Sequence, residues 1–252
     1  VMAGKLKARE ESLEVSNEKL ASLNKSYLDL IGFVAHELKG ILASTILNVY
    51  SVKDGFLGLT NFKQRKALDS VAKNLDYLSQ TVKNFLNLSR IEKGELSLNK
   101  TKFMLKEDVI NEAVEYFAKQ SQDKGISLSN NVSSGILISA DLDLIKIVFH
   151  NLISNAIKYG TVNGKIDVSS SFKNGMLEVS VYNDGIPLQK EEIGRLFKKF
   201  TRLMNKDYKK EKGTGLGLFI ARQIMNNHGG EIRIEPKDGG NVFIFCIPGE
   251  EQ

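Results

Sequence analysis

Large apolar residues recur every seven positions from Leu6 to Ile41, and no proline interrupts them. A seven-residue apolar period is the pattern with which two α-helices supercoil around each other. The residues between are mostly Lys, Glu, Ser and Asn, so a single helix would leave this apolar stripe facing water. We therefore expect a coiled coil with a second chain, with a long solitary helix as the alternative. The stripe consists of Leu6, Leu13, Leu20, Tyr27, Val34 and Ile41.

From about Leu30 the apolar stripe widens, as it does where a two-helix seam opens into a four-helix bundle. Glycines and polar residues between Lys53 and Asn61 mark a turn, and a second helix follows. Two such helices predict a hairpin, and two hairpins complete a four-helix bundle, so a homodimer is expected. The apolar faces are Ile31, Val34, Leu38, Ile41, Leu42 and Val49 on the first helix, and Leu68, Val71, Leu75, Leu78, Val82 and Phe85 on the second.

The composition changes after Gly94, which ends the second helix and marks a domain boundary. Beyond it, helical patterns alternate with strand patterns, and Asn174-Gly175 is a strong hairpin signal. This interleaving predicts an α+β sandwich with helices on one face of a sheet. The expected helices are 106–119, 141–158 and one ending near 228, and the expected strands are 126–132, 136–139, 165–173, 176–182, 231–235 and 241–247. The predicted division is a coiled-coil helix (1–26), an all-α hairpin domain (27–94) and an α+β domain (95–252).

Charge and cysteine content limit the functional classes. The 252 residues carry 35 basic and 30 acidic side chains, and a net charge of +5 is too small and dispersed to indicate nucleic-acid binding. The single cysteine, Cys246, lies in an apolar strand pattern and is expected to be a core residue in a reducing compartment. No uninterrupted apolar run approaches the roughly 20 residues that span a bilayer, so we expect a cytoplasmic fragment without direct membrane contact. Residues 1–4 indicate a truncated end, with the natural chain continuing upstream.

His36, in the first helix, is a candidate for chemistry. At about 100° per residue it lies opposite the apolar positions Val34 and Leu38 and so faces solvent. An exposed histidine is more often inert than catalytic. Glu37 beside it shifts that balance, because a carboxylate can hold imidazole in one tautomer and accept its proton while the other nitrogen attacks phosphorus. The other two histidines are weaker candidates for catalysis. His150 lies within a predicted helix, and His228 is expected to cap a helix C-terminus.

Polar residues of the expected helix 141–158 are candidates for binding a charged ligand. Asn151, Asn155 and Lys158 follow each other at steps of four and three, which places them on one helix face. Two amides and an ammonium group suit a hydrated Mg²⁺ and a phosphate chain. The alternative is a polar face in contact with water. Tyr159 either stacks on a base or covers the core.

Two later loops carry further candidates. Asn183-Asp184-Gly185 ends a strand in a tight loop, where a carboxylate or amide could read the amino edge of adenine; an ordinary turn is the alternative. Residues 213–217 contain three glycines and lead directly into an apolar helix, so their backbone amides can approach phosphate at a helix N-terminus. Their spacing matches neither a Walker loop nor the dinucleotide fingerprint. Residues 195–212, with eight basic side chains, are either a cationic lid over a triphosphate or a solvated loop.

Each of these signals is weak alone, but their order along the chain resembles that of one family. Residues 27–248 are similar to the class I sensor histidine kinases of two-component systems. Residues 89–96 resemble the usual exit from the family's phosphoacceptor hairpin, and five segments resemble its conserved boxes. These segments are 33–42 (H-box), 151–159 (N-box), 183–187 (G1-box), 196–200 (F-box) and 213–218 (G2-box).

The resemblance implies a signalling coiled coil, a dimerisation and histidine-phosphotransfer domain, and a catalytic domain with the Bergerat fold of gyrase and the heat-shock protein 90 chaperones. It implies that His36 is phosphorylated from ATP with Glu37 as its base, and that the phosphoryl group passes to an aspartate of a response-regulator receiver domain. Asn155 would be the main Mg²⁺ ligand, with Asn151 assisting. The other implied contacts are Lys158 and Arg202 to phosphates, Tyr159, Asn183, Asp184 and Gly185 at the base, and Gly213, Thr214, Gly215, Leu216, Gly217 and Leu218 at the phosphate end of the lid.

The chain departs from the family pattern in three places. Gly40 stands where the family usually has a Thr or Asn associated with dephosphorylating the regulator, which weakens the case for phosphatase activity. Ile41 replaces the usual proline, so the helix bend at this point should be weaker or be supplied by Gly40. In the G1-box, Asn183 stands where the adenine-reading aspartate is usual, with Asp184 next to it and Pro187 in place of a glycine. Either Asn183 or Asp184 is therefore the candidate for reading adenine.

Two other functions fit parts of the pattern. A scaffold that signals by docking, with or without a bound nucleotide, is compatible with the altered G1-box. A Bergerat ATPase that hydrolyses ATP is disfavoured, because such enzymes typically carry a catalytic Glu one turn before the metal-binding Asn. This chain has Asn151 at that position.

Overall fold

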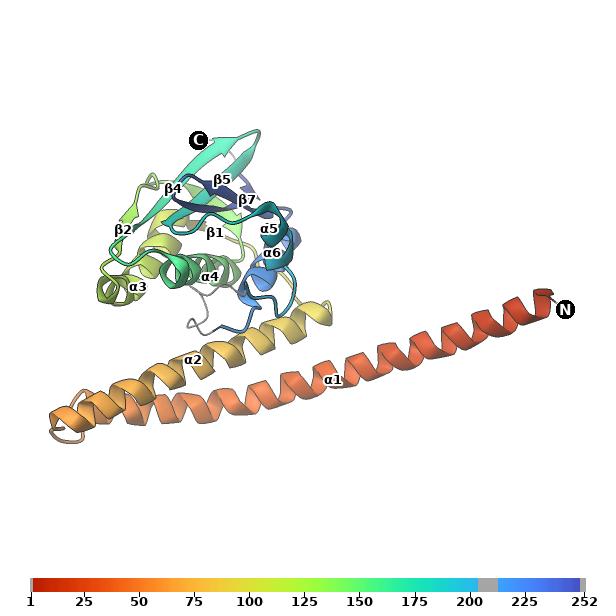
Figure 1. Ribbon diagram of the computed structural model, residues 1–252, viewed down its shortest axis with the longest axis horizontal. Helices are drawn as coiled ribbons and strands as arrows, with labels where there is room; N and C mark the ends of the chain where they lie inside the picture. The colour runs from red at the N-terminus through yellow and green to blue at the C-terminus, as the bar shows by residue number, and fades with distance from the viewer. Residues whose placement is uncertain (1, 204–212, 250–252) are drawn as a thin grey trace. The chain divides into compact units, whose positions relative to one another are not determined.

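The structure, a computed structural model, describes residues 2–203 and 213–249. It divides into two compact units, Val1–Leu96 and Ser97–Gln252. Two long helices form the first unit, and a sheet with helices forms the second (Figure 1). A helical hairpin followed by an α+β sandwich confirms the predicted fold class.

The first unit consists of α1 (Met2–Lys53) and α2 (Phe62–Glu92). Asn61 begins α2 with a capping box: its side chain accepts from the backbone N–H of Gln64, and the Gln64 side chain accepts from the N–H of Asn61. After α2, Gly94 adopts a φ of +69°, the left-handed conformation that favours glycine. Local signals in the sequence therefore set both ends of α2.

Within the chain, α1 and α2 use only part of the predicted apolar face. Leu42 is buried as expected, but Val34 is 45% exposed and Ile41 is 62% exposed. The contact surface between α1 and α2 is shifted by one residue along α1, because α2 packs on the stripe that contains Ala35 and Leu42 instead of Val34 and Ile41. The heptad stripe from Leu13 to Ile41 stays on the surface of the hairpin, as predicted for a helix without a second chain. The seam core is Ala35, Leu42 and Val82, with Leu75, Phe85 and Leu86 packed against it.

Polar contacts join the two helices at the open end of the hairpin. The buried Ser89 Oγ donates a hydrogen bond to the Leu28 carbonyl at 3.0 Å, and Lys93 pairs with Asp29 at 2.5 Å. The hydrogen bond between the charged pair lowers the pKa of Asp29 and raises that of Lys93. A Cβ added at Gly32 would lie 3.1 Å from Ser89 Oγ. The helices approach closely here because residue 32 has no side chain.

One stretch of α1, Leu13–Lys53, contains an 18-residue window with a mean hydropathy of 1.5, of which 11% is buried. By length and composition alone, it is the one helix in the described part of the chain that satisfies the requirement for crossing a membrane. Core helices of soluble proteins satisfy the same requirement. The predicted lack of a sufficient apolar run therefore holds only for uninterrupted runs, since charged residues such as Glu37 and Lys39 divide this stretch.

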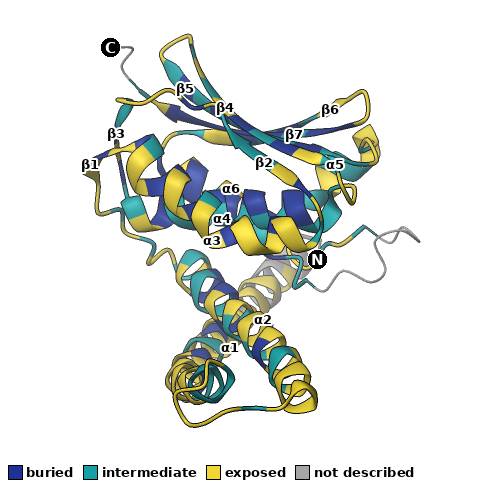
Figure 2. Cartoon of the chain, turned by 90° about the vertical axis from the view of Figure 1, so that its left-hand side faces the viewer, coloured by how far each residue is buried: buried dark blue, intermediate teal, exposed yellow. Residues whose placement is uncertain are grey.

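The second unit is built on a five-stranded sheet in the order β2-β4-β5-β7-β6. The pair β2–β4 is parallel, and the other three pairs are antiparallel. Three helices, α3, α4 and α6, cover one face of this sheet, as predicted (Figure 2). The strands are β2 (Ser127–Asn130), β4 (Lys165–Lys173), β5 (Met176–Asp184), β6 (Glu231–Lys237) and β7 (Gly240–Pro248), and the helices are α3 (Asn111–Asp123), α4 (Leu142–Tyr159) and α6 (Gly217–Asn227).

The main core lies between this sheet and its three helices. On the helix side, alternate residues of β5 are buried along the whole strand and Ile166 and Val168 are buried in β4, while their neighbours form a more polar outer face. The predicted hairpin turn at Asn174-Gly175 is present, and both residues have positive φ. The largest fully buried side chains of this core include Ile145, Phe149, Leu152, Ile153, Ile157, Ile166, Leu177, Ile220 and Phe245.

Two short elements were not predicted: β1 (Thr101–Met104), which pairs with β3 (Leu137–Ala140) in a separate antiparallel sheet, and α5 (Lys190–Leu196), which follows β5. The predicted helix 106–119 begins as a π-helical turn, η1 (Lys106–Ile110), that leads into α3. Of the four residues in β1, only Phe103 is buried. A single inward residue gives no readable alternation, which is why sequence pattern alone missed this strand.

Two glycines of α1 allow a matched test of helix packing. A Cβ at Gly40 would meet nothing within 4 Å, whereas one at Gly32 would press on Ser89, which is held by its bond to Leu28. We expect Gly40→Ala to raise the stability of the hairpin by about 0.5–1 kcal/mol through helix propensity. Gly32→Ala should lower it by about 1 kcal/mol. Urea unfolding followed by circular dichroism measures both, and equal shifts would contradict the close contact at Gly32.

Candidate functional site

His36 and Glu37 lie on the exposed side of α1. Their side chains are 78% and 60% exposed, and His36 Nδ1 lies 3.5 Å from Glu37 Oε1. The predicted orientation of His36 toward solvent is confirmed. Its second ring nitrogen, Nε2, is left for a reaction partner. An exposed imidazole with a neighbouring carboxylate can act as a nucleophile toward a phosphoryl group.

α4 presents the polar residues predicted from its sequence. Asp141 caps its N-terminus by accepting from the Leu144 N–H, and the apolar face of the helix is buried against the sheet. Asn151, Asn155, Lys158 and Tyr159 are half-buried along the rest of the helix. Asn151 Nδ2 is buried and makes no hydrogen bond within the described residues. Its Oδ1 lies 2.7 Å from the position of a Cβ at Gly217, so the start of α6 contacts this part of α4 directly.

The C-terminal end of α4 is held against the end of β5. Thr161, just after the helix, donates its N–H to the Asp184 carbonyl at 3.0 Å. A Cβ at Gly185 would lie 2.9 Å from the Tyr159 carbonyl, so this close approach requires glycine. Lys124 Nζ donates to two carbonyls in the last turn of α4, each at 3.0 Å. No pattern in the sequence indicated this role of Lys124.

The two adenine-reading candidates point to opposite faces of the sheet. Asp184 is on the outer face, where its carboxylate accepts from the Tyr182 hydroxyl at 2.6 Å and from the Lys165 N–H at 2.9 Å. Asn183 is on the helix side and 1% exposed. Its Nδ2 donates to the Asp184 carbonyl at 3.0 Å, whereas its buried Oδ1 makes no hydrogen bond within the described residues. Of the two residues, only Asn183 has a buried side-chain atom without a hydrogen bond among the described residues.

Asn241 is a residue of this region that the sequence prediction missed. It lies opposite Asn183 on β7 and is buried. Its Nδ2 donates to the Ile186 carbonyl and its Oδ1 accepts from the Leu188 N–H, both at 2.9 Å. The loop after β5 is thus held by one amide side chain. An available signal was that Asn241 occupies the inward phase of an otherwise apolar strand.

The glycine-rich segment meets the F-box segment at the start of α6. Gly215 has a φ of +70°, and a Cβ there would lie 2.7 Å from the backbone carbon of Phe200. Thr214 Oγ1 accepts from the Leu216 N–H at 3.3 Å, and α6 begins at Gly217. Helix N-termini with unpaired N–H groups bind anions. Two other predicted residues, Gly213 and Leu218, lie in this segment, and Arg202 lies two residues after Phe200. Most of the predicted lid, at 204–212, lies outside the described residues.

Two cations of this region lie over aromatic rings. Lys199 Nζ is 5.3 Å from the centre of the Phe219 ring, and the Arg222 guanidinium is 5.6 Å from that of Phe197. These contacts connect the F-box segment to α6. The 196–203 segment is therefore fixed to the same helix whose N-terminus follows the glycines.

His228 has a structural role. Its ring Nδ1 lies 2.8 Å from the Ile224 carbonyl, and its Nε2 accepts from the Asp141 N–H at 3.0 Å. It caps α6 as predicted and also links α6 to the N-cap residue of α4. His150, by contrast, stacks on Tyr116, with ring centres 5.2 Å apart.

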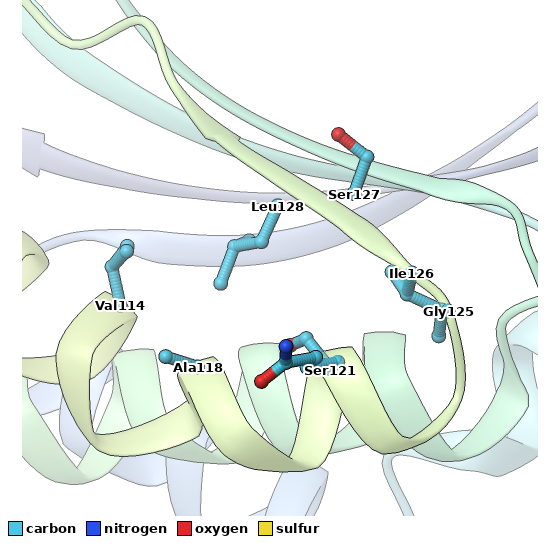
Figure 3. A pocket seen from close by; sticks show the side chains of 8 residues that line it. Val114, Ala118, Ser121, Gly125, Ile126, Ser127 and Leu128 are labelled. Atoms are coloured by element: carbon cyan, nitrogen blue, oxygen red, sulfur yellow. The ribbon is translucent and has the colours of Figure 1, made fainter.

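A cavity elsewhere in this unit contains none of the predicted residues. It lies between α3 and β2 and has a volume of about 410 Å³ (Figure 3). Its lining is Val114, Ala118, Ser121, Gln122, Gly125, Ile126, Ser127 and Leu128. The residues predicted to bind a ligand are instead gathered where α4, the end of β5 and the start of α6 meet.

Two family models match the chain in the order of its two units. Residues 26–94 match the His Kinase A (phospho-acceptor) domain, and residues 140–251 match the histidine kinase-, DNA gyrase B- and HSP90-like ATPases. The solved catalytic domain of histidine kinase ThkA is 35% identical, with 96% of it covered by 60% of this chain and a TM-score of 0.54. The chain belongs to the sensor histidine kinases. The ATPase match supports ATP as the nucleotide of this kinase.

Other relatives extend the similarity across both units. Sensor protein VanS of Enterococcus faecium is 28% identical to this chain, and the match covers 98% of this chain and 64% of VanS. ThkA in complex with response regulator protein TrrA is 28% identical, covers 85% of this chain and 61% of its own, and has a TM-score of 0.56. An uncharacterised sensor-like histidine kinase of Rhizobium meliloti is 29% identical over 91% of this chain. The chain spans 12% to 64% of the lengths of the first curated relatives.

The bond between Tyr182 and Asp184 predicts a pH-dependent contribution to stability. It is the main cause that raises the pKa of Tyr182 to about 12, above its ordinary value of 10.0. The neutral hydroxyl therefore stabilises the fold fully below about pH 10, and this contribution is lost as pH rises toward 12. Tyr182→Phe should cost about 1 kcal/mol at neutral pH and progressively less above pH 10. Urea midpoints at neutral and alkaline pH measure this difference, and an unchanged deficit would contradict it.

Proposed function

We propose that this kinase phosphorylates His36 from ATP and passes the phosphoryl group to an aspartate of a response-regulator receiver domain. The observation that carries the proposal is the cluster of unused hydrogen-bonding groups where α4, β5 and α6 meet. Asn183 Oδ1 and Asn151 Nδ2 are buried without partners in the described residues, next to a glycine-lined helix N-terminus. A nucleotide supplies donors, acceptors and negative charge to such a place.

The residues of this cluster fit the parts of ATP. Asn183 would read the base, beside Gly185 and with Tyr159 packed against it, while Asp184 is committed to Tyr182 and Lys165 and holds the loop. The phosphates would meet backbone amides at the start of α6 and two cationic side chains. That set comprises Gly213, Thr214, Gly215, Leu216, Gly217 and Leu218, together with Lys158 and Arg202.

Mg²⁺ would be held chiefly by Asn155, with Asn151 assisting. A neutral amide oxygen is a hard ligand of the kind that Mg²⁺ takes alongside phosphate oxygens and water. When bound, the ion would neutralise negative charge on the phosphates. The position of Asn155 one turn after Asn151 on α4 supports this assignment, since both side chains lie on the same helix face.

The transfer itself would use His36 and Glu37. Glu37 faces Nδ1 and would hold the neutral imidazole with its proton on that nitrogen, leaving the Nε2 lone pair to attack. The bond from Nε2 to the γ-phosphorus forms as the bond from that phosphorus to the β–γ bridging oxygen breaks, and ADP leaves. Glu37 would take the Nδ1 proton as the ring becomes positive. Positioning and charge neutralisation supply most of the rate in such transfers.

The partners follow from the surface of the hairpin and from relatives. We infer a homodimer, because the heptad stripe from Leu13 to Ile41 is exposed in the single hairpin and a second copy would cover it. A response regulator is supported by the ThkA complex with TrrA. We place both units in the cytoplasm, where ATP and receiver domains are found.

The phosphorylation site is tested by incubating the kinase with Mg-ATP labelled in the γ-phosphoryl group. The expected product is an acid-labile, alkali-stable phosphoprotein, as a phosphorus–nitrogen bond requires. His36→Gln should remove the label completely but leave ATP affinity, measured by calorimetry, within about twofold. Label that persists on His36→Gln would assign the acceptor to another residue, and absence of ATP binding by the parent would favour a scaffold function instead.

Gly40 bears on the dephosphorylation of the response regulator. A Cβ at this position meets nothing within 4 Å, so Gly40→Thr is expected to fold normally. Because family members usually have Thr or Asn here, the variant should dephosphorylate the phosphorylated regulator faster than the parent. Gly40→Ala serves as the control, since it adds the Cβ without the hydroxyl. Equal dephosphorylation rates in all three proteins would show that residue 40 does not determine phosphatase activity in this kinase.

A further inference from the structure

We propose that Lys124 is a positioning residue of the nucleotide site: from the end of α3, its ammonium group holds the last turn of α4 in the conformation that nucleotide binding requires. The role rests on the proposed function, which assigns Lys158 and Tyr159 of that turn to the phosphates and the base of ATP. Lys124 acts on the nucleotide through these two residues.

The last turn of α4 lacks a donor that a continuing helix would supply. The last carbonyls of an α-helix have no partner within the helix. Gly160, which follows α4, has an extended conformation, and its N–H makes the final helical bond, to the Ala156 carbonyl at 2.8 Å. The next N–H, that of Thr161, donates to the Asp184 carbonyl at 3.0 Å instead of turning back to the Ile157 carbonyl. The Ile157 carbonyl therefore needs a donor from outside the helix.

Lys124 supplies donors at this end of α4. Its Nζ donates to the Ile157 and Lys158 carbonyls, each at 3.0 Å. An ammonium group carries three N–H donors on one atom, so it can serve two carbonyls at once. Its positive charge also complements the negative end of the helix dipole. The backbone of Lys158 is thereby fixed, and with it the start of the adjacent Tyr159.

The backbone of Lys124 is held separately from its side chain. Lys124 follows α3 directly, and its carbonyl accepts from the Asn163 N–H at 3.0 Å. The next residue, Gly125, has a φ of +68°, and a Cβ there would overlap Asn163 Oδ1. The Ser127 N–H donates to the Gly164 carbonyl at 3.0 Å. The backbone of Lys124 is thus tied to the loop after α4, and its ammonium group to the last turn of α4 itself.

Loss of the ammonium group should weaken nucleotide binding. Without these donors the last turn of α4 becomes less ordered, and ordering Lys158 and Tyr159 then costs binding free energy. Both side chains would contact the nucleotide before and during transfer, so Kd and KM should rise together while kcat at saturating ATP changes little. We expect an increase of about five- to tenfold, which corresponds to about 1 to 1.4 kcal/mol.

Two variants of α3 and its end test this role. Lys124→Met removes the donors and the charge but keeps a long unbranched side chain. Lys119→Met makes the same change at an exposed position of α3 and controls for the loss of one positive charge. Calorimetry with Mg-ADP measures Kd and the number of sites per chain, and labelling with Mg-ATP measures KM and kcat.

The proposal predicts that Lys124→Met keeps the full number of sites and a kcat within about twofold of the parent, with Kd and KM raised about five- to tenfold. Lys119→Met should match the parent in all four quantities. A merely structural role of Lys124 would instead reduce the number of sites and leave Kd unchanged, because only the folded fraction would fall. That result overturns the proposal, as does an equal loss of affinity in both variants or unchanged binding by Lys124→Met.

Two further outcomes are decisive. If the parent kinase does not bind Mg-ADP, the proposed function fails and the role of Lys124 fails with it; if the parent binds and Lys124→Met binds equally well, only the role of Lys124 fails. If Lys124→Met does not fold, Lys124→Gln takes its place, since its neutral amide is one atom shorter. Lys124→Gln should raise Kd at least about twofold, and a Kd equal to that of the parent overturns the proposal.

Discussion

Much of the candidate site depends on one backbone carbonyl, that of Asp184. It accepts from the Thr161 N–H and from the Asn183 amide, so both of its lone pairs are used. The bond from Thr161 fixes the path of the chain just after α4. The bond from Asn183 fixes the orientation of the buried Asn183 amide on β5. In addition, Lys124 Nζ donates hydrogen bonds to two carbonyls of the last turn of α4. The residues at this end of α4 are therefore held by contacts that do not involve a ligand.

Two glycines show that this arrangement also depends on missing side chains. A Cβ at Gly185 would lie 2.9 Å from the Tyr159 carbonyl, and one at Gly217 would lie 2.7 Å from Asn151 Oδ1. Both distances are shorter than a packed interior permits. The glycines bring α4 against the end of β5 and the start of α6. In this chain Gly217 thus serves the contact between two helices as well as any approach of phosphate to the backbone.

Local and periodic features of the fold were readable from the sequence, whereas choices between equivalent surfaces were not. The turn between Lys53 and Asn61, the turn at Asn174-Gly175 and the periodicity of α4 act within a few residues, so pattern alone locates them. The seam of the hairpin was only partly predicted, because α1 is apolar on two adjacent stripes and α2 covers the one containing Ala35. Periodicity cannot say which stripe a neighbouring helix will cover.

The candidate site shows the same limit. Asn183 and Asp184 were indistinguishable as adenine readers until strand phase placed them on opposite faces of the sheet. Asn241 was missed because its partners, Ile186 and Leu188, are distant in sequence. Contacts of this kind arise from strand register, which the hydrophobic pattern specifies only after pairing partners are known.

The two apolar stripes of α1 bear directly on His36. At about 100° per residue, His36 lies one step around the helix from Ala35 in the intramolecular seam, and about 160° from Val34 in the exposed stripe. Covering either stripe leaves the imidazole on the remaining polar surface, consistent with its 78% exposure in the single hairpin. Its accessibility is thus a property of helical spacing and does not depend on which stripe is buried first. The role proposed for His36 requires access by both a nucleotide and a receiver domain, and this placement permits both in turn.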